Sequence, residues 1–475
     1  MAEKQKLFVN NRWTASSAWE PVFNPYSGRP IAEVAVAGSR LVERAAASTE
    51  AAASAMAAMT AHERASLLSG IVHGIARNAK ILAEILCRDA GKPIALARGE
   101  VNRAKITFTL GAEEARRLAG EAIPLDADPG ARGYWGMVRR FPIGPVLAIS
   151  PFNFPLNLVA HKLAPALAAG NPVLLKLPPQ APLCGLELAR IVKEAGAPPG
   201  AFNVIHCAVP EAEALVRDER FALLSFTGSC AVGWHLKRIA GRKKVLLELG
   251  GNAAAAVMPD ADLAHAAGRL ALGAFVFSGQ VCISVQRVMV HRKVYDAFKK
   301  RFVAEVKKLI VGDPRSKEVV AGPLIDAASA DRVMQWIAQA KSRGARVLTG
   351  NRRQKNILAP TVLENVPRDC RIYTEEVFGP VACLESFENF DQAVERINDS
   401  QYGLQAGIFT RDLGLVNRAF TEIKVGGLIV NDYPTFRTDN APYGGIKASG
   451  LGREGVRYAV QEMTEPRLLV VNSNV

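Results

Sequence analysis

Short apolar segments alternate with helical segments along most of the chain, and this alternation limits the fold more than any other feature of the sequence. After residue 141, apolar runs such as "PVLAIS" (145–150) and "PVLLK" (172–176) are separated by helical stretches such as 156–170. Strands separated by helices of about ten to fifteen residues are typical of βαβ units and a parallel sheet. A second alternation follows Gly251. We therefore predict an α/β protein with two doubly wound domains and ligands at the carboxyl ends of the strands.

Two segments do not follow this alternation. Residues 133–142 ("GYWGMVRRFP") and the C-terminal "EPRLLVVNSNV" are short and rich in β-forming residues. We predict that both are extended arms. Arms of this kind pair between subunits or form a local hairpin, and the sequence leaves both alternatives open.

The chain of 475 residues carries 59 basic and 45 acidic side chains, a net charge of +14. The basic residues form no long run, whereas nucleic-acid binding concentrates them on one face, so we expect no nucleic-acid partner. The seven cysteines form no C-x-x-C pair and the histidines are isolated, so no metal site is predicted. This cysteine usage and the polar N-terminus favour the cytoplasm. Residues 141–160 are uncharged, but their prolines exclude a continuous membrane-spanning helix.

Cys282 lies in "FSGQVCISVQR" (277–287), after a predicted helix over 261–277. Ser278, Gly279 and Gln280 are expected to end that helix and to place Cys282 on a loop. Most cysteines with apolar neighbours are inert core residues, whereas a nucleophile needs access and a lowered pKa. No neighbouring side chain supplies a positive charge, so activation would have to come from a cofactor or from a base elsewhere. Both interpretations stay open at this point.

Glu248 in "LLELGG" has leucines on both sides and two glycines after it. Such a carboxylate is expected to be desolvated, which raises its pKa and suits it to act as a base near neutral pH. The alternative is a strand-end glutamate turned to water. Asn153 in "SPFNFP" lies between Pro151 and Pro155, where its amide is either an oxyanion donor or a turn former.

Gly228 and Gly233 in "SFTGSCAVGWHL" (225–236) mark a strand-to-helix turn that can present backbone N–H groups to a phosphate. The pattern is neither G-x-G-x-x-G nor a P-loop, so alone it is weak evidence for a nucleotide site. Lys176, at the end of "PVLLK", can meet a cofactor hydroxyl or phosphate, or be an ordinary solvated lysine.

In combination, these motifs resemble the aldehyde dehydrogenase superfamily. In order, the chain shows "PFNFP" with Asn153, "LLK" with Lys176, "FTGS", "LELGG" with Glu248, "GQVC" with Cys282, "EEVFGPV" with Glu376 and Phe378, and "PYGGIKASGLGREG" at 442–455. The resemblance covers essentially the whole chain.

The resemblance implies oxidation of an aldehyde to the carboxylic acid with NAD or NADP. Cys282 would attack the aldehyde carbon, and the Asn153 amide and the Cys282 backbone N–H would hold the oxygen of the thiohemiacetal. Hydride transfer would leave a thioester, and Glu248 would activate the water that hydrolyses it. The cofactor would be held by Ser150, Pro151, Phe152, Lys176, Gly228, Ser229, Gly233, Leu249, Glu376 and Phe378.

The resemblance leaves the cofactor preference open. NAD-preferring members of the family often carry a glutamate three residues after the lysine, where this chain has Pro179. Without that carboxylate a 2′-phosphate meets less repulsion, so NADP use is plausible.

By family position, the residues that would lie near the substrate tunnel are Arg103, His161, Val281, Ile283 and Arg437. The two arginines would suit a carboxylate, phosphonate or phosphate tail, through charge-assisted hydrogen bonds. The segment "EVNRA" around Arg103 is similar to non-phosphorylating glyceraldehyde-phosphate dehydrogenases, but Val281 stands where phosphate-handling members tend to have arginine. We predict a small polar or anionic aldehyde: a lactaldehyde-like compound, a semialdehyde acid or phosphonoacetaldehyde.

The resemblance also implies a domain organisation. Residues 1–120 and 142–249 would form a Rossmann-like cofactor-binding domain and residues 250–440 the catalytic domain. Residues 121–141 and 464–475 would form a small β oligomerisation arm of a homodimer or homotetramer. Two alternatives are a CoA-acylating semialdehyde dehydrogenase, which commonly lacks the glutamate base, and a non-catalytic binding protein of the same fold, which would tolerate losses at positions 153, 248 or 282.

Overall fold

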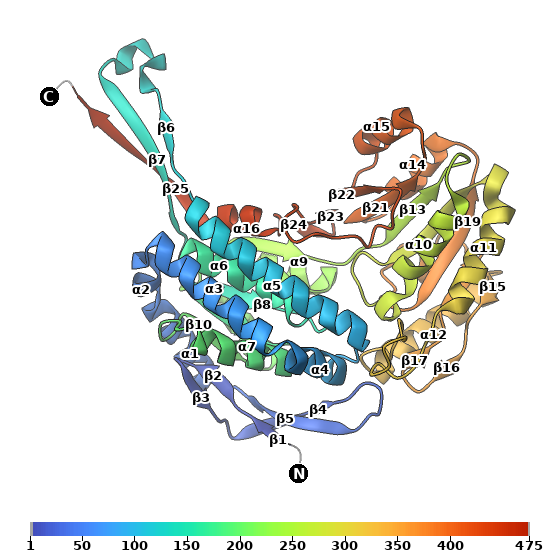
Figure 1. The fold of residues 1–475 in the computed structure, drawn as a ribbon, viewed down its shortest axis with the longest axis horizontal. Coiled ribbons are helices and arrows are strands. Elements are labelled where there is room, and N and C mark those ends of the chain that lie inside the picture. Colours follow the sequence, from blue (N-terminus) through green and yellow to red (C-terminus); the bar gives the residue numbers. More distant parts are fainter. Residues whose placement is uncertain (1–2, 474–475) are drawn as a thin grey trace.

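The computed structural model describes residues 3–473, which form two α/β units side by side and a β arm that projects from one of them (Figure 1). Residues 1–2 and 474–475, at the ends of the predicted segments 1–120 and 464–475, lie outside the described residues. The two doubly wound sheets expected from the alternation of strands and helices are both present.

The first sheet has eight strands in the order β24-β12-β11-β8-β9-β10-β2-β3. Its five central strands are parallel, and β2, β3 and β24 join as antiparallel edges. The central strands are β8 (Val146–Ile149), β9 (Val173–Lys176), β10 (Phe202–Ile205), β11 (Leu223–Thr227) and β12 (Lys244–Glu248). The edge strands are β2 (Leu7–Val9), β3 (Arg12–Thr14) and β24 (Gly450–Leu451).

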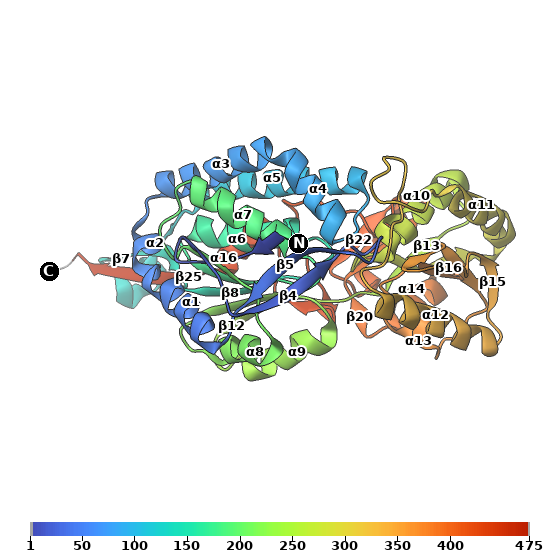
Figure 2. The same ribbon diagram turned by 90° about the horizontal axis from the view of Figure 1, so that it is seen from below.

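Helices cover both faces of this sheet (Figure 2). One face carries α3 (Ala61–Arg77), α4 (Ala79–Asp89), α5 (Ile94–Arg117), α6 (Asn157–Ala169) and α7 (Leu183–Glu194). The other carries α1 (Ser39–Ala51), α8 (Val209–Arg217) and α9 (Cys230–Ile239), with the short α2 (Ala53–Ala58) after α1. Helix α6 is buried along its whole length because it lies between the sheet and α3, α5 and α16, which explains why most of its side chains are apolar.

The strand order places a topological switch point between β8 and β11. The chain passes from β8 to β9 and β10 on one side, and then crosses to β11 and β12 on the other. Loops that leave neighbouring strands in opposite directions open a crevice at their carboxyl ends, where α/β sheets bind ligands. Residues 150–153 follow β8 and residues 228–229 follow β11, so both of these predicted site segments begin at the crevice.

The second sheet has the order β15-β18-β19-β14-β13-β21-β22, in which only the edge strand β15 is antiparallel among the described residues. Its strands are β13 (Ala253–Val257), β14 (Val285–His291), β15 (Arg346–Thr349), β18 (Thr361–Glu364), β19 (Val381–Phe387), β21 (Gln405–Phe409) and β22 (Gly427–Val430). Along β13, Ala255 and Val257 face one hydrophobic core and Ala254 and Ala256 face another. A strand buried on both faces carries an unbroken apolar run, as "AAAAV" does.

Helices flank this sheet as well. On one face lie α10 (Leu263–Phe275) and α11 (Tyr295–Lys308). On the other lie α12 (Ala327–Ser342), α13 (Arg371–Thr374), α14 (Phe390–Asn398) and α15 (Leu413–Glu422). The hairpin β16 (Arg353–Gln354) and β17 (Ile357–Leu358) and the pair β20 (Tyr402–Gly403) and β23 (Ile446–Lys447) are small additions.

The predicted extended segments at 133–142 and the C-terminus pair with each other. Strand β25 (Thr464–Asn472) runs antiparallel to β7 (Tyr134–Pro142) along its whole length, and β6 (Glu121–Ile123) completes the arm. The arm exposes apolar side chains: Tyr134, Trp135, Leu468, Leu469 and Val470. That the arm pairs between subunits stays a prediction.

Two regions complete the first unit. A separate sheet of β1 (Glu3–Gln5), β5 (Pro30–Val36) and β4 (Ala18–Phe23) lies at the N-terminal edge. The predicted domain organisation does not include residues 441–463. In the structure, β24 extends the first sheet and α16 (Val456–Glu462) packs on α5 and α6. Across residues 3–473, no helix is both long and apolar enough to cross a membrane.

Candidate active site

A cavity of about 740 Å³ lies between the two units and contains most of the predicted site residues. This volume falls in the range of small-molecule sites, about 300–1,000 Å³. Its walls include the three predicted catalytic residues, Asn153, Glu248 and Cys282. They also include the predicted cofactor and substrate residues Arg103, Pro151, Phe152, Gly228, Ser229, Leu249, Val281, Ile283, Glu376, Phe378 and Arg437. A larger cleft of about 1370 Å³ elsewhere contains none of the predicted site residues.

Four predicted site residues lie outside the walls of this cavity: Ser150, Lys176, Gly233 and His161. Lys176 ends β9, and its carbonyl accepts a hydrogen bond from the N–H of Ser150 at 3.4 Å. Gly233 lies inside α9, where a Cβ would come within 2.3 Å of the Leu249 side chain. His161 is buried in α6, outside the lining of the cavity, with its Nε2 2.9 Å from Asp439, the partner of Arg103. A role for His161 near the substrate stays a prediction.

The loop that carries Cys282 begins with a sharp turn after α10. Phe277, Ser278 and Gly279 have φ values of 52°, 56° and 69°, a left-handed turn that ends the helix as predicted. The Ser278 hydroxyl donates to the carbonyl of Gly322 at 2.7 Å, and the Gln280 side chain accepts from the N–H of Ile325 at 2.9 Å. These bonds fix the turn, so Cys282 is presented at the cavity by a rigid loop.

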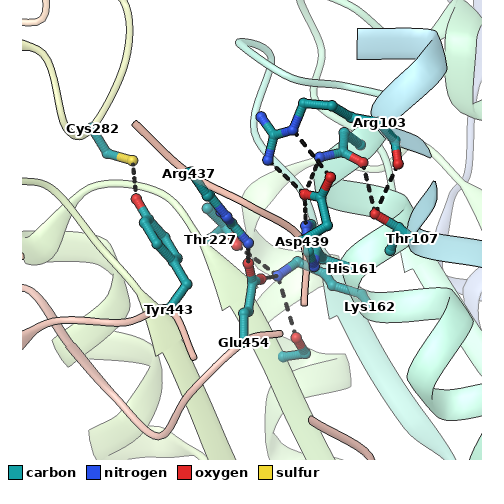
Figure 3. A network of polar contacts seen from close by, with 12 residues as sticks. Arg103, Thr107, His161, Lys162, Thr227, Cys282, Arg437, Asp439, Tyr443 and Glu454 are labelled. Carbon is teal, nitrogen blue, oxygen red and sulfur yellow. Dashed lines mark hydrogen bonds and ion pairs between the residues drawn. The ribbon is translucent and has the colours of Figure 1, made fainter. Parts of the chain in front are cut away.

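The Cys282 sulfur lies 2.9 Å from the hydroxyl oxygen of Tyr443 (Figure 3). Burial raises the pKa of the Cys282 thiol to about 12, against the hydrogen bond with Tyr443 and the nearby Arg437, which lower it. The thiol is therefore neutral near pH 7 in this geometry. To act as a nucleophile it must lose its proton to a group that enters or rearranges in the cavity.

The Asn153 amide is held against the Cys282 loop. Its Nδ2 donates to the carbonyl of Gln280 at 3.0 Å, and its Oδ1 accepts from the N–H of Phe154 at 3.1 Å. The second contact makes Asn153 a turn former as well. Because Nδ2 carries two hydrogens, one remains for an oxyanion.

Glu248 ends β12 and is buried at the cavity wall, which confirms the predicted desolvation and excludes the alternative of a side chain turned to water. Burial raises the pKa of Glu248 well above its ordinary value, and the neighbouring Glu454 carboxylate adds to the effect. Among the described residues, Glu248 Oε2 has no hydrogen-bond partner. An unpaired buried carboxylate at a cavity wall is suited to accept a proton from water.

The predicted cofactor residues form the neighbouring part of the cavity. The Glu376 carboxylate accepts from the N–H of Gly251 at 3.1 Å, and burial raises the pKa of Glu376 to about 7. A Cβ at Gly250 would come within 2.3 Å of this carboxylate, and one at Gly251 within 2.4 Å of the Cys282 carbonyl oxygen, which explains both glycines of "LELGG". Phe152 and Phe378 pack edge to face at 5.8 Å.

The turn after β11 leads into α9 with Ser229 as its N-cap. No side chain caps this helix, so its first N–H groups lack a side-chain acceptor. Backbone donors at the start of a helix suit a pyrophosphate, and a buried carboxylate suits ribose hydroxyls. The donor set of this half of the cavity therefore fits a dinucleotide.

A buried network of charges lies behind the cavity (Figure 3). Arg437 and Lys162 approach the Glu454 carboxylate to 2.9 and 3.4 Å. Burial alone would raise the pKa of Glu454, but Lys162 and Arg437 outweigh it and lower the pKa to about 2. Glu454 therefore stays charged and favours the protonated form of Glu248.

Arg103 and Arg437, predicted to bind an anionic substrate, each already contact a carboxylate. Arg103 pairs with Asp439 at 2.6 Å, and its side chain is 28% exposed. The Arg437 side chain is 8% exposed and pairs with Glu454. Both arginines border the cavity, but Arg103 keeps an exposed edge there, whereas little of the Arg437 side chain is exposed.

Sequence reasoning missed four polar residues of this region: Lys162, Asp439, Tyr443 and Glu454. Tyr443 and Glu454 lie inside the segment "PYGGIKASGLGREG" (442–455), which carries part of the resemblance but gave neither residue a role. A further signal was Lys162, a charge inside the otherwise apolar helix 156–170.

Comparison with known proteins gives a consistent result. A family model described as "Aldehyde dehydrogenase family" matches residues 13–469. The 3-sulfolactaldehyde dehydrogenase of Priestia aryabhattai is 42% identical over 98% of this chain and 98% of its own. The crystal structure of aldehyde dehydrogenase 21 from Physcomitrella patens, in complex with the reaction product succinate, superposes with a TM-score of 0.98 at 42% identity, covering 100% of this chain and 99% of that one. The glyceraldehyde-3-phosphate dehydrogenase GapN from Methanocaldococcus jannaschii, complexed with NADP, gives a TM-score of 0.93 at 37% identity, covering 96% of this chain and 100% of that one.

Proposed function

Because the chain belongs to the aldehyde dehydrogenase family, we propose that it oxidises a small anionic aldehyde to the carboxylic acid, with NAD or NADP as hydride acceptor. The observation that carries this proposal is the convergence of Cys282, Glu248 and Asn153, distant in sequence, on the wall of one cavity. The experiment that tests it is the formation of NADH or NADPH across a panel of neutral and anionic aldehydes.

The three residues divide the chemistry. The Cys282 thiol gives up its proton to a base in the cavity, and the thiolate forms a bond to the aldehyde carbon. The resulting oxyanion accepts hydrogen bonds from Asn153 Nδ2 and the Cys282 N–H. A bound NAD or NADP would supply the hydride acceptor, and loss of hydride from that carbon would leave a thioester on Cys282. Glu248 removes a proton from water as the water attacks the thioester. The carboxylic acid then leaves, and the Cys282 thiolate is regenerated.

For the cofactor, we propose that Glu376 and Phe378 contact the nicotinamide ribose and ring, and that the turn at Gly228 and Ser229 contacts the pyrophosphate. Pro151, Phe152 and Leu249 would line the same part of the cavity. Lys176 would reach the adenosine ribose from the end of β9. Glu376 and Phe378 belong to the second unit and the other residues to the first, and the division into a cofactor-binding and a catalytic domain stays a prediction.

Pro179 is exposed, three residues after Lys176, and gives a test of cofactor preference. We expect Pro179→Glu to lower kcat/KM for NADP relative to NAD by about tenfold, because a carboxylate there would repel a 2′-phosphate. Pro179→Gln is the uncharged control. Rates of NADH and NADPH formation at fixed aldehyde concentration give the ratio, and equal effects of the two substitutions would contradict the prediction.

For the substrate, three related proteins act on or release compounds with an anionic tail: a sulfonate, a carboxylate and a phosphate. In this chain the exposed edge of Arg103 is a cationic group at the cavity wall, near the apolar Val281 and Ile283. A guanidinium binds carboxylates and sulfonates through paired hydrogen bonds. We therefore propose that Arg103 contacts the anionic tail.

Arg103→Gln tests this proposal. We expect kcat/KM for succinate semialdehyde to fall about tenfold or more, while kcat/KM for butanal changes little, because a hydrogen bond between charged groups is lost only with the anionic substrate. Arg98→Gln, an exposed arginine on the same helix outside this cavity, is the control. An unchanged preference between the two aldehydes in Arg103→Gln would overturn the assignment.

The CoA-acylating alternative is disfavoured by Glu248. Its buried carboxylate, whose Oε2 has no hydrogen-bond partner in residues 3–473, suits a base for hydrolysis, which an acyl transfer to CoA does not need. A non-catalytic relative would not need all three of Asn153, Glu248 and Cys282 at one cavity.

A further inference from the structure

Tyr443 makes a direct contact with the proposed nucleophile. Its hydroxyl oxygen lies 2.9 Å from Cys282 Sγ, and no other hydrogen bond of this hydroxyl is found among the described residues. The tyrosine side chain is 5% exposed. Its backbone is fixed by two hydrogen bonds with Glu454, Tyr443 N–H to Glu454 O at 3.0 Å and Glu454 N–H to Tyr443 O at 2.7 Å. The phenol is therefore held in place by the backbone and by burial.

Arg437 packs on the face of the Tyr443 ring, whereas Cys282 contacts its hydroxyl. Its guanidinium carbon lies 3.7 Å from the centre of the Tyr443 ring, and its Nη2 donates to the Glu454 carboxylate at 2.9 Å. Figure 3 shows the order in space: Cys282, the Tyr443 ring, Arg437 and then Glu454, with Lys162 beyond. A cation against the face of an aromatic ring is attracted to it, so Arg437 supports the orientation of the phenol.

We propose that Tyr443 is a positioning residue that holds the Cys282 sulfur and favours its thiolate through the phenol hydroxyl, and that Arg437 acts through Tyr443 and not by binding the substrate. This inference rests on the proposed function only in taking Cys282 as the nucleophile.

The direction of the effect follows from hydrogen-bond chemistry. A neutral thiol can donate to the phenol oxygen or accept from the hydroxyl, but a thiolate can only accept. In the thiolate state Tyr443 must donate, and a hydrogen bond to a charged acceptor is stronger than one to a neutral acceptor. The hydrogen bond accordingly opposes the rise in the Cys282 pKa that burial causes. The other ionisable groups that face the thiol are Glu376 and Glu248, which disfavour the thiolate, and Arg437, which favours it.

Tyr443→Phe tests the contact without removing the ring on which Arg437 packs. The rate of Cys282 alkylation by iodoacetamide is measured from pH 7 to 10 without aldehyde or cofactor, by mass spectrometry of the Cys282 peptide. We expect the pKa of Cys282 to rise by about one unit, so that alkylation at a fixed pH slows about tenfold. Removing an oxygen opens access to the thiol, so a steric effect would act in the opposite direction.

Tyr433→Phe is the matched control, because Tyr433 lines the same cavity and packs against an arginine, Arg269, without contacting Cys282. It should leave the alkylation profile unchanged. An unchanged profile in Tyr443→Phe, or an equal change in both variants, would overturn the proposal.

Arg437→Gln separates the two roles of the arginine. If Arg437 acts through Tyr443, kcat falls about equally for succinate semialdehyde and butanal, and alkylation of Cys282 slows as in Tyr443→Phe. A loss confined to KM for the anionic aldehyde would assign Arg437 to substrate binding and contradict the inference. Failure of the proposed function can be told apart from failure of this inference. Aldehyde oxidation that survives Cys282→Ser would contradict the proposed function. The alkylation profiles test this inference alone, because they do not depend on turnover.

Discussion

Cys282→Ser is expected to lower kcat for aldehyde oxidation by about 10⁴-fold or more. A serine hydroxyl at the same position is a far weaker nucleophile, because its alkoxide forms only at much higher pH than a thiolate. The loop around residue 282 would keep its conformation, since it is fixed by Ser278 and Gln280 and not by the sulfur. The measurement is NADH or NADPH formation with the best aldehyde of the panel, at saturating cofactor.

Cys87→Ser is the matched control for this substitution. Cys87 is a buried cysteine in α4, outside the cavity of Cys282, so its replacement should leave kcat within about twofold of the unmodified protein. Retention of aldehyde oxidation by Cys282→Ser, with the same substrate and cofactor, would remove Cys282 from the mechanism.

Glu248→Gln is expected to separate the two halves of the reaction. Steady-state turnover should fall about 10²- to 10⁴-fold, the range for loss of a general base. The first turnover should still release about one equivalent of NADH or NADPH per active site, because attack by Cys282 and hydride transfer precede hydrolysis. Rapid-mixing absorbance at 340 nm gives the burst and the slow phase. Loss of the burst together with the steady state would place Glu248 in the first half of the reaction instead.

The pH dependence of turnover gives a second measure of the same residue. Only the ionised carboxylate accepts a proton, and burial raises the pKa of Glu248 well above its ordinary value near 4.5. Turnover limited by hydrolysis should therefore increase with pH through an inflection above 4.5, with protonated Glu248 inactive on the acid side. In Glu248→Gln this inflection should be absent.

The sequence predicted the strands and helices because their apolar patterns are local. The runs "PVLAIS" and "PVLLK" became β8 and β9, and the helices predicted over 156–170 and 261–277 became α6 and α10. The turn at Ser278–Gln280 was also predictable, since it ends an apolar helix with residues that favour a break. The desolvation of Glu248 followed from its leucine neighbours in a central strand.

The contacts around the cavity were not predictable in the same way. Cys282 and Tyr443 are 161 positions apart, and Arg103 and Asp439 are 336 apart. Tyr443 lies in the quoted segment 442–455, but no local pattern states which residue it contacts, because that depends on where the chain returns. For the same reason the sequence did not predict that Arg437 pairs with Glu454 and packs on Tyr443. It also did not predict that His161 contacts Asp439.

The covalent intermediate tests the role of Cys282 most directly. Glu248→Gln is mixed with the aldehyde and NAD or NADP, quenched in acid after the burst, and digested for mass spectrometry. The mechanism predicts an acyl group of the substrate's mass on the peptide that contains Cys282, at about one equivalent per NADH or NADPH formed in the burst. A burst without this adduct, or with the acyl group on another residue, would contradict it.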